Sequence, residues 1–375
     1  MKYKRAELKP DEKACLELRG LYEQYGYKKY KMSKFEEYSL YVENKDFLAT
    51  DKVITFTDLD GRLLALKPDV TLSIIKNTKA TVECNEKLYY IENVYRESRE
   101  SHTFQEISQM GLEYIGKVDA YCITEVIALA AKSLRTISKD YILEVSHMNF
   151  VVELLESLHV TEHIKYKLLR HIRIKNVDGI RKYAQSADLS EAQIESLCSL
   201  PQLYGDVAKT LTRAREICLT AAMEQALNEL AEIYGALKAL GLAKNIQVDL
   251  SIVNDIDYYN GIIFKGYIRE LGKCVLAGGQ YDQAMALLGK KVDAIGFALY
   301  LNEINRIAGE SPSYDVDAVI LYKCSEGVVA IAEAVRLLQK EGISVRAEKA
   351  LPPNLRYKAL YRLEDGQLRK EDSLC

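Results

Sequence analysis

The chain has 375 residues, of which 48% are hydrophobic and 28% charged, and its formal net charge is −3. This length exceeds one typical domain, and the composition suits a packed, water-exposed protein of two or three units. The charge excludes a global basic field of the kind that draws proteins to nucleic acids, although an acidic average does not exclude a local basic groove.

The eight cysteines and five histidines form no metal-binding pattern. The chain contains no C-x-x-C pair and no H-E-x-x-H motif, so we expect no structural metal, and we interpret the cysteines as reduced thiols. The N-terminal MKYKRAELKPDEK lacks the apolar run of a signal peptide, and no segment approaches the roughly 20 apolar residues of a membrane span. These features predict a cytoplasmic protein without cofactor, metal or membrane segment.

Helix and strand patterns alternate over the first 140 residues. Three- and four-residue apolar steps indicate helices, and short β-branched or aromatic runs bounded by turn residues indicate strands. In chain order, the predicted elements are a helix over 10–26, strands at 52–57 and 61–66, a short helix over 69–77 capped by Asp69, a hairpin of 88–95 and 104–115, and a helix over 119–138.

Residues 150–242 are predicted to be a helical insertion, because they hold few β-branched runs and no hairpin signal. Strands return at 246–253, 261–268 and 273–277, and a helix follows Gly278-Gly279. Beyond a linker at 311–313, we expect a strand at 317–322, a helix over 326–341 capped by Ser325, a strand at 343–348 parallel to the first, and a polar tail after Pro352-Pro353.

Separated strand blocks around a helical insertion predict an α+β fold with a largely antiparallel sheet flanked by helices. We place one domain at residues 1–310, with the insertion at 150–242. A reduced α/β unit with a single β-α-β motif is expected at 314–375. None of these patterns by itself predicts a function.

Four segments, in order, resemble the signature blocks of histidyl-tRNA synthetase, a class II aminoacyl-tRNA synthetase. They are Leu66-Lys67-Pro68-Asp69-Val70-Thr71; Tyr95-Arg96-Glu97-Ser98-Arg99 with Ser108-Gln109-Met110-Gly111-Leu112-Glu113; Ile256-Asp257-Tyr258-Tyr259-Asn260-Gly261; and Gly278-Gly279-Gln280-Tyr281-Asp282 with Ile295-Gly296-Phe297-Ala298. The resemblance covers roughly residues 10–306 and implies a class II synthetase-like core.

The resemblance also implies a histidine pocket. The residues that fall where the family recognises histidine are Asp69, Thr71, Gln109, Glu113, Tyr258 and Tyr259. Carboxylate and amide oxygens suit an α-ammonium group, and a carboxyl with tyrosine hydroxyls suits an imidazole ring. The alternative is that the tyrosines are core residues and the carboxylates solvated.

The cations that amino-acid activation needs are mostly missing. Joining a carboxylate to the α-phosphate of ATP requires fixed positive charges. Where the family carries arginines, this chain carries Asn254, Gln280 and Glu303, and Ser98 stands for a family glutamate. Arg96 remains and could hold a carboxylate or phosphate, with a surface salt bridge as the alternative. We expect no catalytic residues in this chain.

Two further departures concern partners. The family's dimer block is represented by residues 26–36, with Ser33 where the family has proline, and we expect a homodimer. The part beyond residue 314 is shorter than a full anticodon-binding domain, so no tRNA is expected to bind.

A disabled synthetase relative that keeps its histidine pocket resembles the regulatory subunit of ATP phosphoribosyltransferase. That resemblance implies association with a short catalytic subunit, activation of that subunit, and feedback by histidine in the first step of histidine biosynthesis. Two alternatives stay open: a divergent histidyl-tRNA synthetase or related ATP-dependent amino-acid-activating enzyme, and an interaction protein that binds tRNA or a translation factor.

Overall fold

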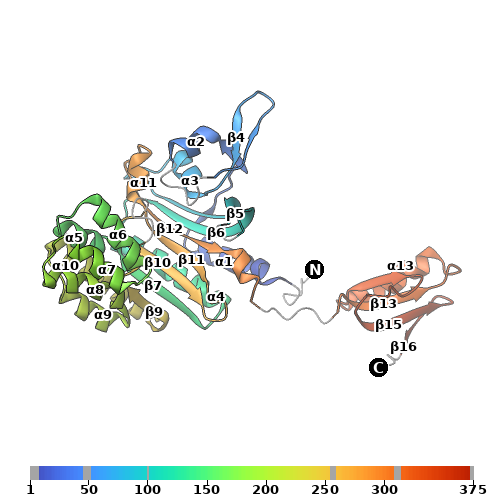
Figure 1. Ribbon diagram of the computed structural model, residues 1–375. Coiled ribbons are helices and arrows are strands. Elements are labelled where there is room, and N and C mark those ends of the chain that lie inside the picture. The colour runs from blue at the N-terminus through green and yellow to red at the C-terminus, as the bar shows by residue number, and fades with distance from the viewer. Residues whose placement is uncertain (1–7, 45–51, 99–100, 254–258, 308–313, 372–375) are drawn as a thin grey trace. The chain divides into compact units, whose positions relative to one another are not determined.

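A computed structural model describes residues 8–44, 52–98, 101–253, 259–307 and 314–371 (Figure 1). The chain divides into two compact units, one spanning Leu8–Ile307 and the other containing the C-terminal residues from Ala308. Among the described residues, no helix has both the length and the apolar character needed to cross a bilayer.

A nine-stranded sheet forms the centre of the first unit. Its strands, in spatial order, are β1 (Lys28–Lys29), β5 (Glu86–Glu97), β6 (Phe104–Gly116), β12 (Asp293–Tyr300), β11 (Cys274–Gln280), β10 (Ile262–Ile268), β7 (Tyr141–His147), β9 (Ile246–Asp249) and β8 (Tyr204–Gly205). Neighbouring strands are antiparallel except in the pairs β1–β5 and β7–β9. The predicted α+β class with a largely antiparallel sheet is confirmed.

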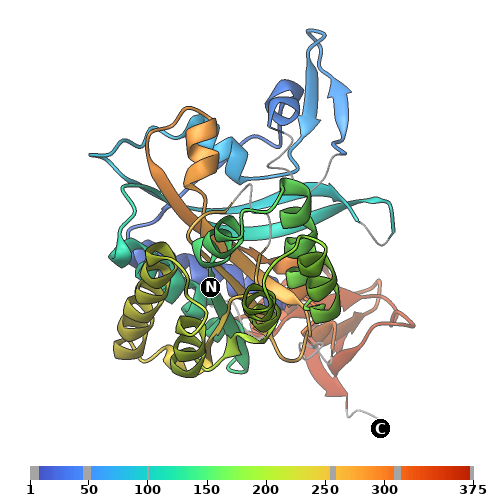
Figure 2. The same cartoon turned by 60° about the vertical axis from the view of Figure 1, so that its left-hand side comes forward.

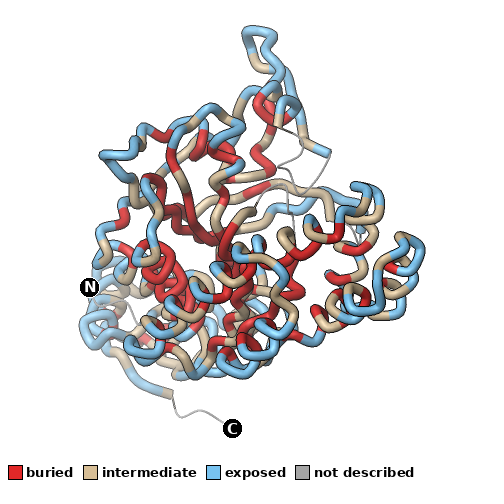
Figure 3. The backbone as a smooth tube through the Cα atoms, turned by 90° about the vertical axis from the view of Figure 1, so that its left-hand side faces the viewer, coloured by how far each residue is buried: buried red, intermediate tan, exposed pale blue. Residues whose placement is uncertain are grey.

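Helices α1 (Pro10–Gln24) and α4 (Ala120–Ile137) pack on one face of this sheet. The Tyr22 hydroxyl lies 2.9 Å from that of Ser133 on α4, and the Tyr22 ring centroid lies 6.1 Å from that of Phe297 on β12. The Asp119 carboxylate caps α4 by accepting from the Cys122 amide at 2.9 Å. Buried residues concentrate in these strands and in α4 (Figure 3).

The predicted insertion is helical and lies beside one end of the sheet (Figure 1). Its helices are α5 (Met148–Ser157), α6 (Glu162–Arg173), α7 (Val177–Gln185), α8 (Glu191–Ser199), α9 (Val207–Arg215) and α10 (Ala221–Ala239). The helices of the insertion, coloured green to olive in Figure 2, lie close together. The long helix α10 packs against α4 and α5, and its Glu229 carboxylate lies 2.9 Å from Nε2 of His147 at the end of β7. The insertion is therefore anchored to the central sheet.

Two strands in this region were not predicted from the sequence. Leu143 and Val145 of strand β7 are buried in the same cluster as α4. The strand was not predicted because it begins only three residues after that helix ends. Strand β8 has two residues that pair with β9, so the insertion is not purely helical. Such a short pairing has no sequence period of its own and depends on the neighbouring strand.

A small lobe carries three further strands, β2 (Phe35–Glu37), β3 (Thr55–Thr57) and β4 (Leu63–Leu66), with helices α2 (Tyr38–Glu43) and α3 (Thr71–Asn77). The predicted β3–β4 hairpin forms, and its turn is closed by the Asp58 amide donating to the Arg62 carbonyl at 2.9 Å. Helix α3 begins two residues later than predicted, but Asp69 still caps it by accepting from the Leu72 amide at 3.0 Å.

The C-terminal unit is larger than one β-α-β motif. Its sheet has the order β14 (Val345–Glu348), β13 (Val316–Tyr322), β15 (Tyr357–Glu364) and β16 (Gln367–Glu371), and α13 (Val328–Lys340) packs on it through Ala334 and Leu338. The predicted parallel pairing of β13 with β14 is confirmed.

Two predictions for this unit were wrong. The polar tail forms strands β15 and β16, joined at Asp365-Gly366, where both residues have positive φ as a two-residue hairpin turn requires. Ser325 does not cap α13, because the chain first turns between Lys323 and Glu326 and the cap position falls on Gly327.

Candidate functional site

Asp69, on the loop between β4 and α3, forms an ion pair with Arg96 of β5. Arg96 Nη2 lies 3.1 Å from Asp69 Oδ2, and Arg96 Nε donates to the Pro68 carbonyl at 2.6 Å. The other oxygen of Asp69 caps α3. Arg96 is 20% and Asp69 16% exposed, so both charges remain accessible to a ligand. Arg96 therefore forms a salt bridge, which was the alternative expected for it, at a partly buried position.

Glu113 lies on β6. It approaches the Asp69 loop through Thr71, which follows Asp69 by two residues and donates to Glu113. Its side chain is 2% exposed, and it accepts from the Tyr281 hydroxyl at 2.7 Å and from the Thr71 hydroxyl at 3.5 Å. Burial raises the Glu113 pKa to about 8, and the nearby Asp69 carboxylate adds to this, while the two hydroxyl donors act in the opposite direction. The alternative of a solvated carboxylate is therefore wrong for Glu113.

Glycines on three adjacent strands make room for this site. A Cβ on Gly296 would lie 1.7 Å from Glu113 Oε2, and one on Gly111 would lie 2.1 Å from the ring of Tyr90. On β11, a Cβ on Gly279 would lie 2.8 Å from the ring of Tyr259. Glu113, Gly296 and Gly279 are direct neighbours across β6, β12 and β11. Each missing side chain leaves space that a neighbouring functional side chain occupies.

Gln109 lies on β6 opposite Glu92 of β5 and Tyr300 of β12. It is 3% exposed. Asn302 of the short helix α12 (Leu301–Ile304) accepts from the Ser108 amide at 2.6 Å and donates to the Glu106 carbonyl at 3.3 Å, which attaches α12 to β6. Gln109, Gly111 and Glu113 are alternate residues of β6, so their side-chain positions lie on the same face of the sheet.

Two site residues were missed by sequence reasoning. Tyr281 lies in the fourth signature block but was not assigned to the pocket, although it is the hydroxyl nearest Glu113. Tyr90 is fully buried, and burial followed by the charges of Glu113 and Asp69 raises its pKa well above the ordinary value. Only the cross-strand register, which places Tyr90 opposite Gly111, could have identified it.

The residues that replace family cations have structural partners. Gln280 accepts from the Ile262 amide through Oε1 at 2.7 Å, and Glu303 pairs with Arg306 at 2.9 Å. Ser98 lies in the turn between β5 and β6, where its hydroxyl accepts from the Ser101 amide at 3.3 Å. Asn254 and Tyr258 lie outside the described residues. The predicted site residues that are described lie on one side of the sheet and the adjoining α3 loop.

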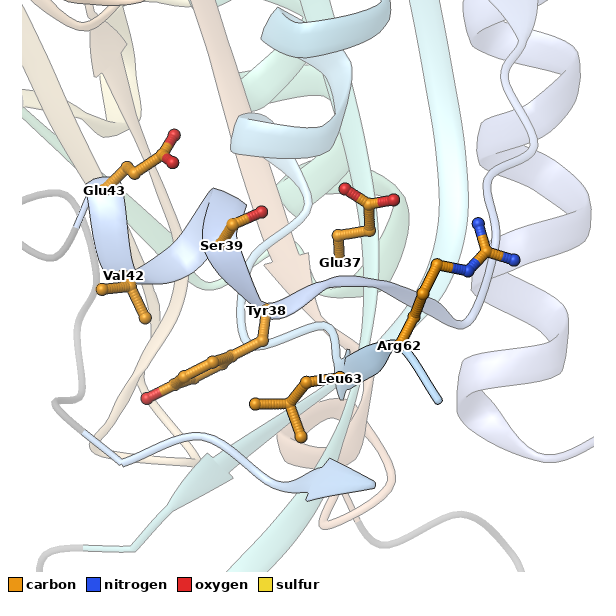
Figure 4. Close-up of a pocket in the computed structure, with 7 residues that line it drawn as sticks. All are labelled: Glu37, Tyr38, Ser39, Val42, Glu43, Arg62 and Leu63. Atoms are coloured by element: carbon orange, nitrogen blue, oxygen red, sulfur yellow. The ribbon is translucent and has the colours of Figure 1, made fainter. Parts of the chain in front are cut away.

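A pocket of about 470 Å³ lies elsewhere, on the small lobe (Figure 4). Its lining residues are Glu37, Tyr38, Ser39, Val42, Glu43, Arg62 and Leu63, none of which was predicted as a site residue. Figure 4 shows Val42 and Leu63 flanking the ring of Tyr38. In the described part of the chain, no cluster of three or more His, Cys, Asp or Glu side chains is arranged to hold a metal ion.

The arrangement of charges suits a zwitterionic amino acid. Asp69 offers a carboxylate to an ammonium group, and Arg96 beside it offers a planar guanidinium to a carboxylate. Glu113 and Tyr281, joined by a 2.7 Å hydrogen bond, supply polar atoms for a polar side chain of such a ligand. Because Arg96 already contacts Asp69 and Pro68, it is poorly placed to serve as the phosphate-binding cation of an activating enzyme.

Comparison with known proteins agrees with this geometry. The histidyl-tRNA synthetase family matches residues 3–304. An ATP phosphoribosyltransferase regulatory subunit from Clostridium botulinum (strain Langeland) is 31% identical over 296 residues, which are 77% of this chain and 70% of that protein. The chain belongs to the histidyl-tRNA synthetase family, among its ATP phosphoribosyltransferase regulatory subunits.

Solved structures show that the regulatory-subunit fold extends over nearly the whole chain. A Bacillus halodurans protein, described as an ATP phosphoribosyltransferase regulatory subunit or histidyl-tRNA synthetase, has a TM-score of 0.81 at 23% identity and covers 94% of this chain and 93% of its own. A Thermotoga maritima chain from an ATP phosphoribosyltransferase complex has a TM-score of 0.62 at 17% identity, covering 78% and 97%. The predicted class II synthetase-like fold is confirmed.

Proposed function

We propose that this regulatory-subunit family member is a histidine sensor that acts on a separate, short catalytic subunit of ATP phosphoribosyltransferase. The observation that carries the proposal is the Asp69–Arg96 ion pair beside the buried Glu113, because it matches both ends of histidine. The α-ammonium would contact Asp69, Thr71 and Gln109, as predicted from the sequence.

The imidazole would contact Glu113 and the tyrosine hydroxyls, including Tyr281. Tyr259 borders the floor of the pocket at Gly279, and Tyr258 belongs to the same set by the family resemblance alone. The α-carboxylate would contact Arg96, which would then bridge it to Asp69. Histidine regulates only if it binds one arrangement of the assembly more tightly than another.

We further propose that the chain does not turn over substrate. Gln280 is neutral and Glu303 is acidic, so neither supplies positive charge toward a triphosphate. Their side chains instead contact the Ile262 amide and Arg306. A cytoplasmic homodimer inside a hetero-oligomer, without tRNA, completes the proposal. The exposed strand β1 at the sheet edge supports a self-contact, because its outer backbone groups lie open to pairing.

The functional domains are proposed to be residues 1–310, including the insertion at 150–242, and residues 314–375. The deciding experiment is calorimetry of L-histidine with the full chain, without ATP, followed by reconstitution with the short catalytic subunit. We expect saturable histidine binding and histidine-dependent inhibition of the reconstituted enzyme. A chain that shows histidine-dependent ATP–pyrophosphate exchange would instead be an activating enzyme.

A further inference from the structure

Hydroxyl groups surround the Glu113 carboxyl, and none of the described cations pairs with it. Its Oε2 accepts from Tyr281 at 2.7 Å, and its Oε1 has only the long contact to Thr71 at 3.5 Å. Within the described part of the chain it forms no ion pair, and no positive charge contributes to its pKa. Arg96, the predicted cation of the site, is paired with Asp69.

A buried carboxylate in this setting is costly. Removing an ionised group from water without a compensating charge is so unfavourable that the group takes up a proton instead. Two hydroxyl donors reduce that cost, but the Asp69 carboxylate in the same pocket increases it. The resulting pKa of about 8 leaves the acid form predominant at neutral pH. We place the proton on Oε1, because Oε2 already accepts the short hydrogen bond from Tyr281.

We propose that Glu113 is a neutral carboxylic acid in the empty pocket, and that it selects ligands whose ring carries an unprotonated nitrogen to accept its hydrogen. This inference rests on the proposed histidine-binding function and specifies the protonation state of the ligand class. Neutral imidazole offers such a nitrogen, whereas a phenyl ring does not and an imidazolium ring has none left.

The proposal fixes the proton balance of binding. In the complex, Glu113 and the imidazole share one proton, whether it stays on Glu113 or moves to the ring. Free imidazole has a pKa of about 6.5, so below that pH both partners are protonated and binding must release one proton. Above about 8 both have lost theirs, and binding must take one up. Histidine affinity is therefore highest between these values and falls up to about tenfold per pH unit on either side.

The other titratable groups that face Glu113 do not produce this profile. Tyr90 of β5 has a pKa well above its ordinary value and stays neutral throughout. Tyr281, at the end of β11, and Thr71 of α3 contribute hydroxyl groups, and β12 contributes Gly296. Asp69, on the β4–α3 loop, lies 3.1 Å from Arg96. The α-ammonium group of the ligand also titrates at alkaline pH, so a matched variant is needed to separate it.

The test is isothermal titration calorimetry of L-histidine with the full chain from pH 5.5 to 9.5. Wild type is compared with Glu113→Gln, whose amide donates a hydrogen but cannot ionise. We expect wild-type affinity to fall, relative to Glu113→Gln, by about fivefold between pH 8 and 9. Tyr281→Phe removes a donor that favours the ionised form, so its alkaline fall is expected at higher pH. Glu144→Gln, a half-buried carboxyl on β7 whose pKa is also raised by burial, is the control and keeps the wild-type profile.

Parallel profiles of wild type and Glu113→Gln above pH 8 would overturn the proposal and leave the proposed function standing. The same holds if Tyr281→Phe does not move the alkaline fall. A chain that binds no histidine at any pH would overturn both.

Discussion

Arg96 and Asp69 hold each other in place, 3.1 Å apart, beneath the loop that carries Pro68. The pair couples two signature blocks that lie 27 residues apart in the sequence. Both side chains are partly buried, and each charge neutralises the other. Either charge alone at this position would destabilise the folded protein. The same contact occupies the cation that an ATP-binding site would need, while it presents opposite charges side by side to an amino acid.

Replacing Arg96 by lysine is expected to weaken histidine binding about tenfold. Lysine keeps the charge but loses the planar fork that contacts Pro68 and Asp69 together, and a hydrogen bond to a charged group contributes about 1.5–3 kcal/mol. Calorimetry at pH 7.5 measures the change. Arg306→Lys, which alters an exposed arginine paired with Glu303, is the control. Equal affinity of Arg96→Lys and wild type would contradict the role of the pair.

Glu113→Ala and Tyr259→Phe are expected to weaken histidine binding while leaving the complex with the catalytic subunit intact. Glu113 lies against Gly296, and Tyr259 lies against Gly279, on neighbouring strands of the sheet. Size-exclusion chromatography checks assembly, and inhibition of the reconstituted enzyme checks regulation. Tyr204→Phe, at an exposed tyrosine of β8, serves as the control. Unchanged sensitivity to histidine would refute the pocket assignment.

No histidine-dependent exchange of pyrophosphate into ATP is expected. Gln280 and Glu303 are neutral and acidic at positions that require cations, and Arg96 is engaged by Asp69. An exchange assay with a competent histidyl-tRNA synthetase as positive control measures this. Exchange above the no-enzyme background would show that other cations replace the missing ones.

Lys67 is expected to be a strong stability determinant. Its ammonium is 1% exposed and lies 2.6 Å from the Glu92 carboxylate. Lys67→Met alone leaves that carboxylate without a partner and is expected to cost about 3 kcal/mol of unfolding free energy. Lys67→Met combined with Glu92→Leu removes both charges and is expected to cost much less. Urea denaturation of wild type, both single variants and the double variant gives the coupling energy, and additive losses would contradict the buried pair.

The stability of the ligand-free chain is expected to depend on pH through Glu113. Its pKa is raised in the folded state to about 8, so it stays protonated while the unfolded form ionises near 4.5. Its contribution is therefore fully present below pH 4.5 and is lost as the pH rises to about 8, by at most about 1.4 kcal/mol per pH unit. Glu113→Gln should gain stability relative to wild type across this range and not beyond it. Thermal unfolding of both proteins, with the exposed Glu270→Gln as control, measures the difference, which stays constant with pH if Glu113 has an ordinary pKa.

The amount that could be predicted from sequence differs between regions for identifiable reasons. Helices α1 and α4 have strong apolar periods, and their bounds agree with prediction within two residues. Strands β15 and β16 were missed although Asp365-Gly366 is a hairpin signal, because the flanking residues are mostly polar. Strand β8 could not be predicted at all, since two residues carry no period.

The sequence by itself determined the class of the protein. Its signature blocks, the helical insertion and the substitutions at Gln280 and Glu303 are properties of residue order, and they indicate a synthetase-like core without the activating cations. Only the tertiary structure decided how the site residues behave. The fold pairs Arg96 with Asp69, and it buries the Glu113 carboxyl beside Tyr281, which raises the pKa of Glu113. The reason is physical: charge state depends on burial and on neighbours from distant segments, and the cross-strand register that sets both is a property of the folded chain.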